Sequence, residues 1–286
     1  MRRWRGFAVA TTAVGIGLGL ASAGASPALA GVQSITVFDC GRITSPNRSL
    51  WSPGVDVDVR HEMVASCYLI RHDDGLMMWD VGISDSVAEL PDGLTVAGGM
   101  ITQRVEKTLA AQMDEIGVRP EDVGHLAMSH THPDHTGNAN RFTAAVVYMQ
   151  QAEYDAAFGP DAARFNFRPD TYDKLANNEF VKLDGSHDVF GDGSVVILSA
   201  PGHTPGHQVL YVELPEYGPV VLSGDLWHFR SNYDNDRVPG FNFDRGQTLD
   251  SINKIKAFIE RTGATLWIQH DKDQAAEIPH APQSVR

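Results

Sequence analysis

A cluster of histidines follows a short apolar segment near the middle of the chain. Residues 129–135 read Ser-His-Thr-His-Pro-Asp-His, so the side chains of His130, His132, Asp134 and His135 lie within six residues. Neutral imidazole and carboxylate are ligands that Zn²⁺ accepts where no thiolate is present. Six residues cannot complete two metal shells, so a site of this kind needs further donors from elsewhere in the chain.

Three such donors each come directly after an apolar run with β-branched residues. They are His203, Asp225 and His270. In α/β folds, functional side chains gather where strands end and loops begin. We therefore expect these three residues to join the histidine cluster in one metal-binding site.

The elements that must position these donors alternate between strands and helices. Short apolar runs predict strands over 35–40, 63–71, 76–80, 125–129, 144–149, 195–199, 208–214, 220–223 and 264–269. The turn at 72–75 predicts a hairpin between the second and third of these strands. Helical spacing of apolar residues predicts helices over 101–116, 151–158 and 248–261. The irregular segment 159–180 is interpreted as a surface insertion, and the whole pattern predicts an α/β fold.

The N-terminal segment is typical of a signal peptide. Arg2, Arg3 and Arg5 precede an uncharged stretch over 7–25, and the small-x-small sequence 28–30 follows it. A transmembrane anchor is the alternative, but the many Gly, Ala, Ser and Thr residues make the stretch weakly hydrophobic. We expect cleavage after Ala30, a secreted or periplasmic protein with no stable membrane insertion, and a single catalytic domain over 31–286.

Charge limits the class of substrate. The formal net charge of the chain is −13, and removal of the three arginines in residues 1–30 would leave −16. An acidic protein of this kind repels phosphate backbones, which argues against a nucleic-acid partner.

Two cysteines, Cys40 and Cys67, lie in separate predicted strands. An exported protein permits a disulfide between them. Two buried free thiols are an equal alternative, because free cysteine packs as a small hydrophobic residue.

The complete donor set resembles the ligand signature of the metallo-β-lactamase superfamily, and the resemblance spans nearly all of residues 31–286. It implies a four-layer αββα sandwich and two Zn²⁺ per chain, although Fe, Co or Mn also bind such sites. Matched residue by residue, it implies one metal held by His130, His132 and His203. It implies a second metal held by Asp134, His135 and His270, with Asp225 bridging the two.

Two cations that share a water lower its pKa, so that hydroxide becomes the nucleophile near neutral pH. Asp134 could position this nucleophile and accept its proton. The chemistry then requires no serine or cysteine nucleophile.

Local segments resemble the N-acyl homoserine lactonases within this superfamily. They are 80–82, 204–208, 223–228 and 232–239. The resemblance implies a hydrolase of carboxylic esters that opens the lactone ring of N-acyl homoserine lactones, which is quorum quenching, on a small-molecule substrate. The alternative is another dinuclear zinc hydrolase of the same fold, either a broad lactonase/esterase or a β-lactamase. Dimers occur among the relatives, so a homodimer is compatible with the resemblance.

One position departs from the common lactonase pattern. Many lactonases carry a tyrosine three residues after the bridging aspartate, whereas this chain carries His228, as does one exported subgroup. Its imidazole could donate a hydrogen bond to the substrate carbonyl or the leaving oxygen. A packing role is the alternative for His228, and Asp80 is interpreted either as orienting a ligand histidine or as a turn former. Lining an acyl pocket and packing in the core are equal alternatives for Trp51, Met63, Phe165 and Phe167.

Overall fold

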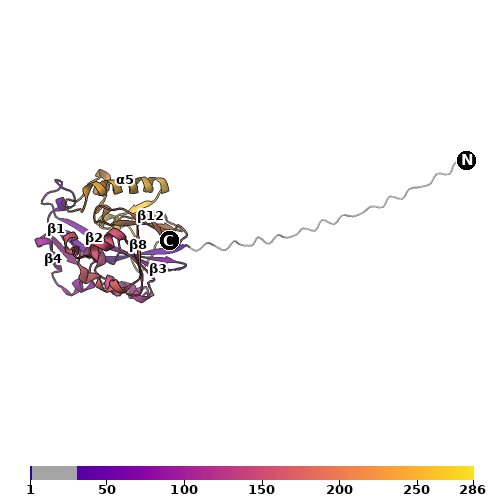
Figure 1. The fold of residues 1–286 in the computed structure, drawn as a ribbon, viewed down its shortest axis with the longest axis horizontal. Coiled ribbons are helices and arrows are strands. Elements are labelled where there is room, and N and C mark those ends of the chain that lie inside the picture. Colours follow the sequence, from indigo (N-terminus) through magenta and orange to yellow (C-terminus); the bar gives the residue numbers. More distant parts are fainter. Residues whose placement is uncertain (2–30) are drawn as a thin grey trace.

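The computed structural model describes Met1 and residues 31–286 (Figure 1). Apart from Met1, the predicted signal peptide lies outside the described residues. Within the described part of the chain, no helix has both the length and the apolar character needed to cross a membrane.

The larger of two sheets has eight strands in the order β4-β5-β1-β2-β3-β6-β7-β8. The pairs from β4 to β3 are antiparallel, whereas β3, β6, β7 and β8 run parallel. The bounds are β1 Val32–Ser45, β2 His61–His72, β3 Gly75–Trp79, β4 Leu94–Val96, β5 Ile101–Arg104, β6 His125–Ala127, β7 Val146–Gln150 and β8 Phe180–Leu183. The β2–β3 hairpin predicted from the turn at 72–75 is confirmed.

The smaller sheet has five strands in the order β13-β12-β11-β10-β9. Its pairs are antiparallel except for β12 and β13, which are parallel. The bounds are β9 His187–Asp188, β10 Val195–Ser199, β11 Gln208–Leu214, β12 Gly218–Leu222 and β13 Thr265–Trp267.

Helices cover the outer faces of the two sheets. The α-helices are α1 Leu109–Glu115, α2 Pro133–Thr136, α3 Gln151–Ala157, α4 Arg230–Asn235, α5 Arg245–Thr262 and α6 Lys272–Ala275. The short 3₁₀ turns are η1 Arg48–Leu50, η2 Asp85–Glu89, η3 Ala97–Gly99, η4 Pro120–Asp122, η5 Ala139–Arg141, η6 Ala162–Phe165, η7 Pro169–Thr171, η8 Asp173–Asn177 and η9 Gly224–Leu226. The longest helix among the described residues, α5, begins where the Asp244 carboxylate accepts from Gln247 N and ends at Gly263, whose φ is 69°.

Three apolar clusters define the layers. The cluster between the two sheets contains Trp79 and Met77 from the larger sheet and Leu210 and Trp267 from the smaller one. A second cluster packs α1 and α3 on the larger sheet, and a third packs α5 on the smaller sheet. Figure 1 shows α5 lying over β12 on the outside of the molecule. The predicted αββα sandwich is therefore confirmed.

Two of the predicted elements are wrong. Residues 101–116 do not form one helix, because 101–104 pair with β1 as strand β5 and the helix begins only after Thr108 caps Ala111 N. Segment 159–180 is not a surface insertion, because its short turns place Phe167, Tyr172 and Leu175 in the core beneath the larger sheet.

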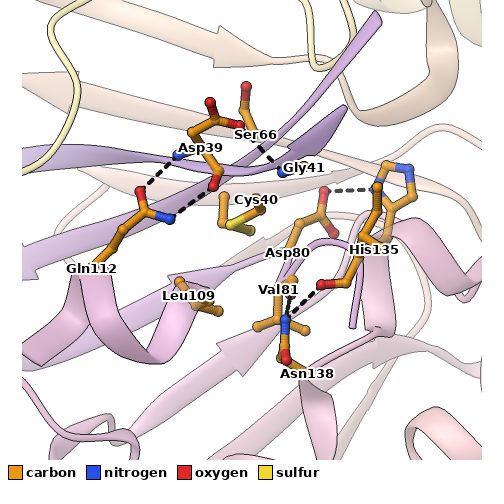
Figure 2. The surroundings of a disulfide bond; sticks show 12 residues. Asp39, Cys40, Gly41, Ser66, Asp80, Val81, Leu109, Gln112, His135 and Asn138 are labelled. Carbon is orange, nitrogen blue, oxygen red and sulfur yellow. Dashed lines mark hydrogen bonds and ion pairs between the residues drawn. A yellow bond between two sulfur atoms is a disulfide. The ribbon is translucent and has the colours of Figure 1, made fainter. Parts of the chain in front are cut away.

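Cys40 and Cys67 form a disulfide between β1 and β2, with their Cα atoms 5.9 Å apart. Of the two alternatives left open by the sequence, the structure has the bond rather than the free thiols. Figure 2 shows the bond beside the segment that carries Asp80 and Val81, close to His135.

Candidate metal centre

Four donors from three loops form the first cluster: His130 and His132 after β6, His203 after β10, and Asp225 after β12. The His130 Nε2–His132 Nδ1, His203 Nε2–His132 Nδ1 and His203 Nε2–His130 Nε2 distances are 2.8, 3.1 and 3.2 Å. Tetrahedral ligands about 2.1 Å from Zn²⁺ would lie about 3.4 Å apart, close to this spacing.

Asp134, His135 and His270 form the second cluster. His135 and Asp134 lie in the short helix α2, and His270 follows β13. The Asp134 Oδ2 atom lies 4.0 Å from His135 Nε2 and 3.8 Å from His270 Nε2. The structure therefore brings all seven donors chosen from the sequence to one end of the sandwich.

Asp225 belongs to the first cluster and also faces the second with its carboxylate. Its Oδ2 is 3.2 Å from His203 Nε2, and its Oδ1 is 2.9 Å from His270 Nε2 and 3.2 Å from His135 Nε2. The backbone N of Asp225 donates to His207 Nε2 at 2.9 Å, and His207 Nδ1 pairs with Ala200 O at 3.0 Å, so both nitrogens of this imidazole are engaged with the backbone.

The far nitrogen of each imidazole in the two clusters lies beside an oxygen that can accept its hydrogen bond. His135 Nδ1 lies 3.0 Å from Asp80 Oδ2, and His130 Nδ1 lies 3.0 Å from Ser129 Oγ. The remaining three imidazoles pair with Phe165 O, Asn242 Oδ1 and Val64 O. An N–H fixed in this way leaves the lone pair of the other nitrogen facing the centre, as metal-ligating histidines require. Asp80 thus orients a candidate ligand histidine, one of the two roles predicted for it.

The protonation states of the buried side chains in the site also suit the binding of cations. Burial lowers the pKa of His132 to about 3, which keeps the imidazole neutral. Burial opposes ionisation of Asp225, but the facing imidazoles, led by His228 and His270, hold its pKa well below the usual range. The His135 Nε2 and Asp225 Oδ1 atoms are buried and, although they lie 3.2 Å apart, neither makes a well-aligned hydrogen bond among the described residues. A buried imidazole nitrogen and a buried carboxylate oxygen that make no hydrogen bond are suited to coordinating Zn²⁺.

A cavity of about 560 Å³ opens onto the two clusters. Asp134, Asp225, His228 and His270 contribute to its floor, and most of its remaining lining is apolar. Three of the four residues with open roles, Trp51, Met63 and Phe167, are buried and also line this cavity. Phe165 instead lines a smaller neighbouring cavity of about 240 Å³.

His228 lies at the junction of the cavity and the first cluster. Its Nε2 is 3.0 Å from Asp225 Oδ2, and its ring stacks on His270 with an interplanar angle of 18°. Its Nδ1 has no hydrogen-bond partner within the described part of the chain. Burial lowers the pKa of His228 to about 4, so the side chain is neutral near pH 7.

The sequence profile of the metallo-beta-lactamase superfamily matches residues 62–262. This chain belongs to that superfamily. The N-acyl homoserine lactonase AttM of Azorhizobium caulinodans is 33% identical over 234 residues, which cover 78% of this chain and 87% of that protein. The N-acyl homoserine lactonase AiiA of Bacillus thuringiensis subsp. kurstaki is 28% identical over 223 residues, 77% of this chain and 86% of that protein.

Solved structures agree on the fold of this superfamily member. An N-acyl homoserine lactone hydrolase with the product N-hexanoyl-L-homoserine bound at its catalytic metal center superposes with a TM-score of 0.78. The match covers 89% of this chain and 100% of that one at 24% identity, so it supports the architecture alone.

Sequence reasoning missed two residues that support the donors. Asn242 is paired with His203, and Glu153 is bonded to the loops on both sides of the first cluster. Neither carries a local sequence signal, because both act through contacts between segments far apart in the chain.

Proposed function

We propose that this protein hydrolyses the lactone ring of N-acyl homoserine lactones and so acts as a quorum-quenching enzyme. The observation that carries the proposal is the pair of His/Asp clusters at the floor of a largely apolar cavity. An acylated lactone has the matching parts: a polar ring carrying an ester bond, and an apolar chain. Curated relatives across most of the chain bear the name N-acyl homoserine lactonase.

The proposed ligands are those that meet in the two clusters. His130, His132 and His203 would hold one Zn²⁺, Asp134, His135 and His270 would hold the other, and Asp225 would contact both. When bound, two such cations supply Lewis-acid polarisation of the ester carbonyl and a water of lowered pKa.

Asp134 is the proposed proton acceptor. Its carboxylate is the least buried in the centre, with 18% of the side chain exposed, and it borders the cavity. It can therefore contact a water or a substrate atom in the cavity as well as the two imidazoles of its own cluster.

His228 is the proposed hydrogen-bond donor to the lactone carbonyl or the leaving oxygen. It borders the cavity, and its ring is placed between Asp225 and His270. Its lowered pKa keeps it neutral, so the ring carries a single N–H. In the proposed role that proton lies on the nitrogen that faces the substrate oxygen, rather than on Nε2 towards Asp225 Oδ2 alone.

The apolar wall of the cavity is the proposed site for the acyl chain. It is formed from β1, β2, η1 and the β4–β5 region by Ile43, Leu50, Trp51, Met63, Val96 and Met100. Burial of each methylene against such a wall contributes about 0.8 kcal/mol, so longer chains should bind more tightly until the wall ends.

A substrate panel tests the function. We expect zinc-loaded protein to open the ring of N-acyl homoserine lactones. Ring opening is measured by proton release and by the mass of the product. A chelator should abolish turnover. β-Lactams, simple lactones and aryl esters complete the panel. Preferential turnover of one of these classes would replace the proposed substrate with that class on the same site.

We also propose that residues 1–30 are removed on export and that the mature protein is secreted or periplasmic. The Cys40–Cys67 bond supports this, because disulfides persist in oxidising compartments. N-terminal analysis of protein recovered outside the cytoplasm should find Gly31 first; an intact Met1 in that fraction would contradict the proposal.

A further inference from the structure

A buried carboxylate outside the seven donors lies beneath the first cluster. Glu153 is in the first turn of α3, directly after β7, and only 1% of it is exposed. A carboxylate buried this deeply is unfavourable unless its oxygens accept several hydrogen bonds.

Glu153 joins the two loops that carry the three histidines of the first cluster. Its Oε1 accepts from Thr131 N at 2.8 Å, and Thr131 lies between His130 and His132. Its Oε2 accepts from Thr204 Oγ1 at 2.8 Å and from Gly206 N at 2.9 Å, directly after His203. One side chain therefore connects loops more than 70 residues apart.

The second of these loops is packed tightly onto α3. A Cβ on Gly206 would collide with the backbone N, Cα and Cβ of Glu153, so only glycine allows this approach. The close packing of Gly206 on α3 therefore holds the His203 loop against the Glu153 carboxylate.

We propose that Glu153 is a positioning residue for the first metal cluster, whose carboxylate sets the separation of the His130–His132 loop and the His203 loop and so the affinity of that cluster for a divalent cation. The inference rests on the proposed metal sites but not on the identity of the substrate.

The hydrogen-bond chemistry requires a carboxylate at this position. All three partners donate, so both oxygens of the Glu153 side chain must accept. Glutamine has one oxygen and one NH₂ group, which would place a donor against either Thr131 N–H or Gly206 N–H. Aspartate keeps both oxygens but is one methylene shorter.

Metal binding by the full-length protein tests the inference. We expect Glu153→Gln to lower the affinity of the protein for one of two bound Co²⁺ ions by about 10- to 100-fold, measured by competition with a chelator. This is the usual effect of removing a residue that hydrogen-bonds a metal ligand from outside. The Co²⁺ absorption spectrum should change for that ion and stay unchanged for the other. Equal weakening of both ions, or of neither, would overturn the inference.

Two control variants separate positioning from general stability. Asp188→Asn makes the same carboxylate-to-amide change where the carboxylate accepts from Gly191 N and Gly193 N, away from the cluster. Tyr172→Phe removes a hydrogen bond from Tyr172 Oη to Ala157 O at the other end of α3. Both should retain two tightly bound ions, and loss of one ion in Tyr172→Phe would show that any loosening of α3 suffices, which would overturn the specific role of Glu153.

A milder variant covers the case in which Glu153→Gln does not fold. Thr204→Val removes one hydrogen-bond donor to Glu153 and keeps the shape of the side chain. It should therefore lower the affinity for the same ion by a few-fold, and an unchanged affinity would contradict the inference. Because these readouts need no lactone, a wild type that binds two ions but turns over no lactone would refute the proposed function and leave this inference standing.

Discussion

Gly82 packs directly against Cys40. A side chain on Gly82 would collide with Cys40 Cβ and with the sulfur of Cys67. The segment from Asp80 to Gly82 is therefore packed in direct contact with the disulfide. The same segment reaches the metal centre, because Val81 N donates to His135 O at 2.9 Å and Gly137 N donates to Gly82 O at 2.8 Å. Figure 2 shows the disulfide and the Asp80–His135 contact on the two sides of this segment.

This crowding predicts a strong effect of Gly82→Ala. Gly82 and Gly117 have nearly the same φ, 65° and 68°, but nothing lies within 4 Å of a Cβ on Gly117. Alanine at either position costs about 1–2 kcal/mol of unfolding free energy through left-handed backbone strain. Overpacking should cost Gly82→Ala about 1–3 kcal/mol more. Chemical denaturation of both variants measures the difference, and equal losses would show that the segment moves away without penalty.

The disulfide should contribute to stability by restricting the unfolded chain. It connects residues 27 positions apart, and a bond closing a loop of this length stabilises by about 3.5 kcal/mol. We expect the Cys40→Ala/Cys67→Ala double variant to unfold at a lower denaturant concentration than the wild type. A phosphine reductant should shift the wild type towards the variant and leave the variant unchanged; if the reductant shifts both equally, its effect does not come from this bond.

The seven candidate donors could be chosen from the sequence because four of them lie within six residues and the other three follow apolar runs. Three imidazoles and a carboxylate within six residues are rare outside metal sites, and His203 and Asp225 follow strands whose apolar runs are readable. Strands β10 and β11 have the predicted bounds because each is a continuous apolar or alternating run between turn residues.

What the sequence could not predict depends on contacts between distant segments. Residues 101–104 fit a helical pattern as well as a strand, and only their pairing with β1 decides between them. Likewise Glu153 resembles any glutamate in a helical first turn until the fold brings Thr131 and Gly206 to it.

Asp80→Asn should weaken the binding of a metal ion by the second cluster. Asp80 accepts from Ser129 N at 2.7 Å and from His135 Nδ1 at 3.0 Å, and its φ is 52°. Asparagine tolerates this backbone conformation, so the change acts on the hydrogen bond alone. Its NH₂ group would face either the Ser129 N–H or the His135 N–H, so one of the two hydrogen bonds that hold the His135 side chain and the Ser129 backbone is lost. We expect a loss of about 10- to 100-fold in affinity for one ion. Chelator competition measures it, and the ion lost should differ spectroscopically from the one lost in Glu153→Gln.

The apolar wall predicts a dependence on acyl length. Met100 is partly exposed and lines the cavity next to η3, so Met100→Trp should fill its outer part without disturbing the donors. We expect kcat/KM to fall by about 10-fold or more for decanoyl and dodecanoyl substrates and by much less for butanoyl. Val57→Trp, at an exposed position that does not line the cavity, is the control. A uniform loss for all chain lengths would place the acyl chain elsewhere.

His228 offers a test that separates chemistry from metal binding. Tyrosine and phenylalanine have nearly the same shape, but only tyrosine carries an O–H group that can donate to a substrate oxygen. If His228 acts as a donor, His228→Phe should lower kcat by about 100-fold or more while both ions stay bound, and His228→Tyr should recover much of that loss. Both variants remove the contact from His228 Nε2 to Asp225 Oδ2 at 3.0 Å, so a role limited to holding Asp225 predicts equal losses and weaker metal binding in both. Steady-state kinetics on zinc-loaded protein, with metal content measured on the same samples, distinguishes the two outcomes.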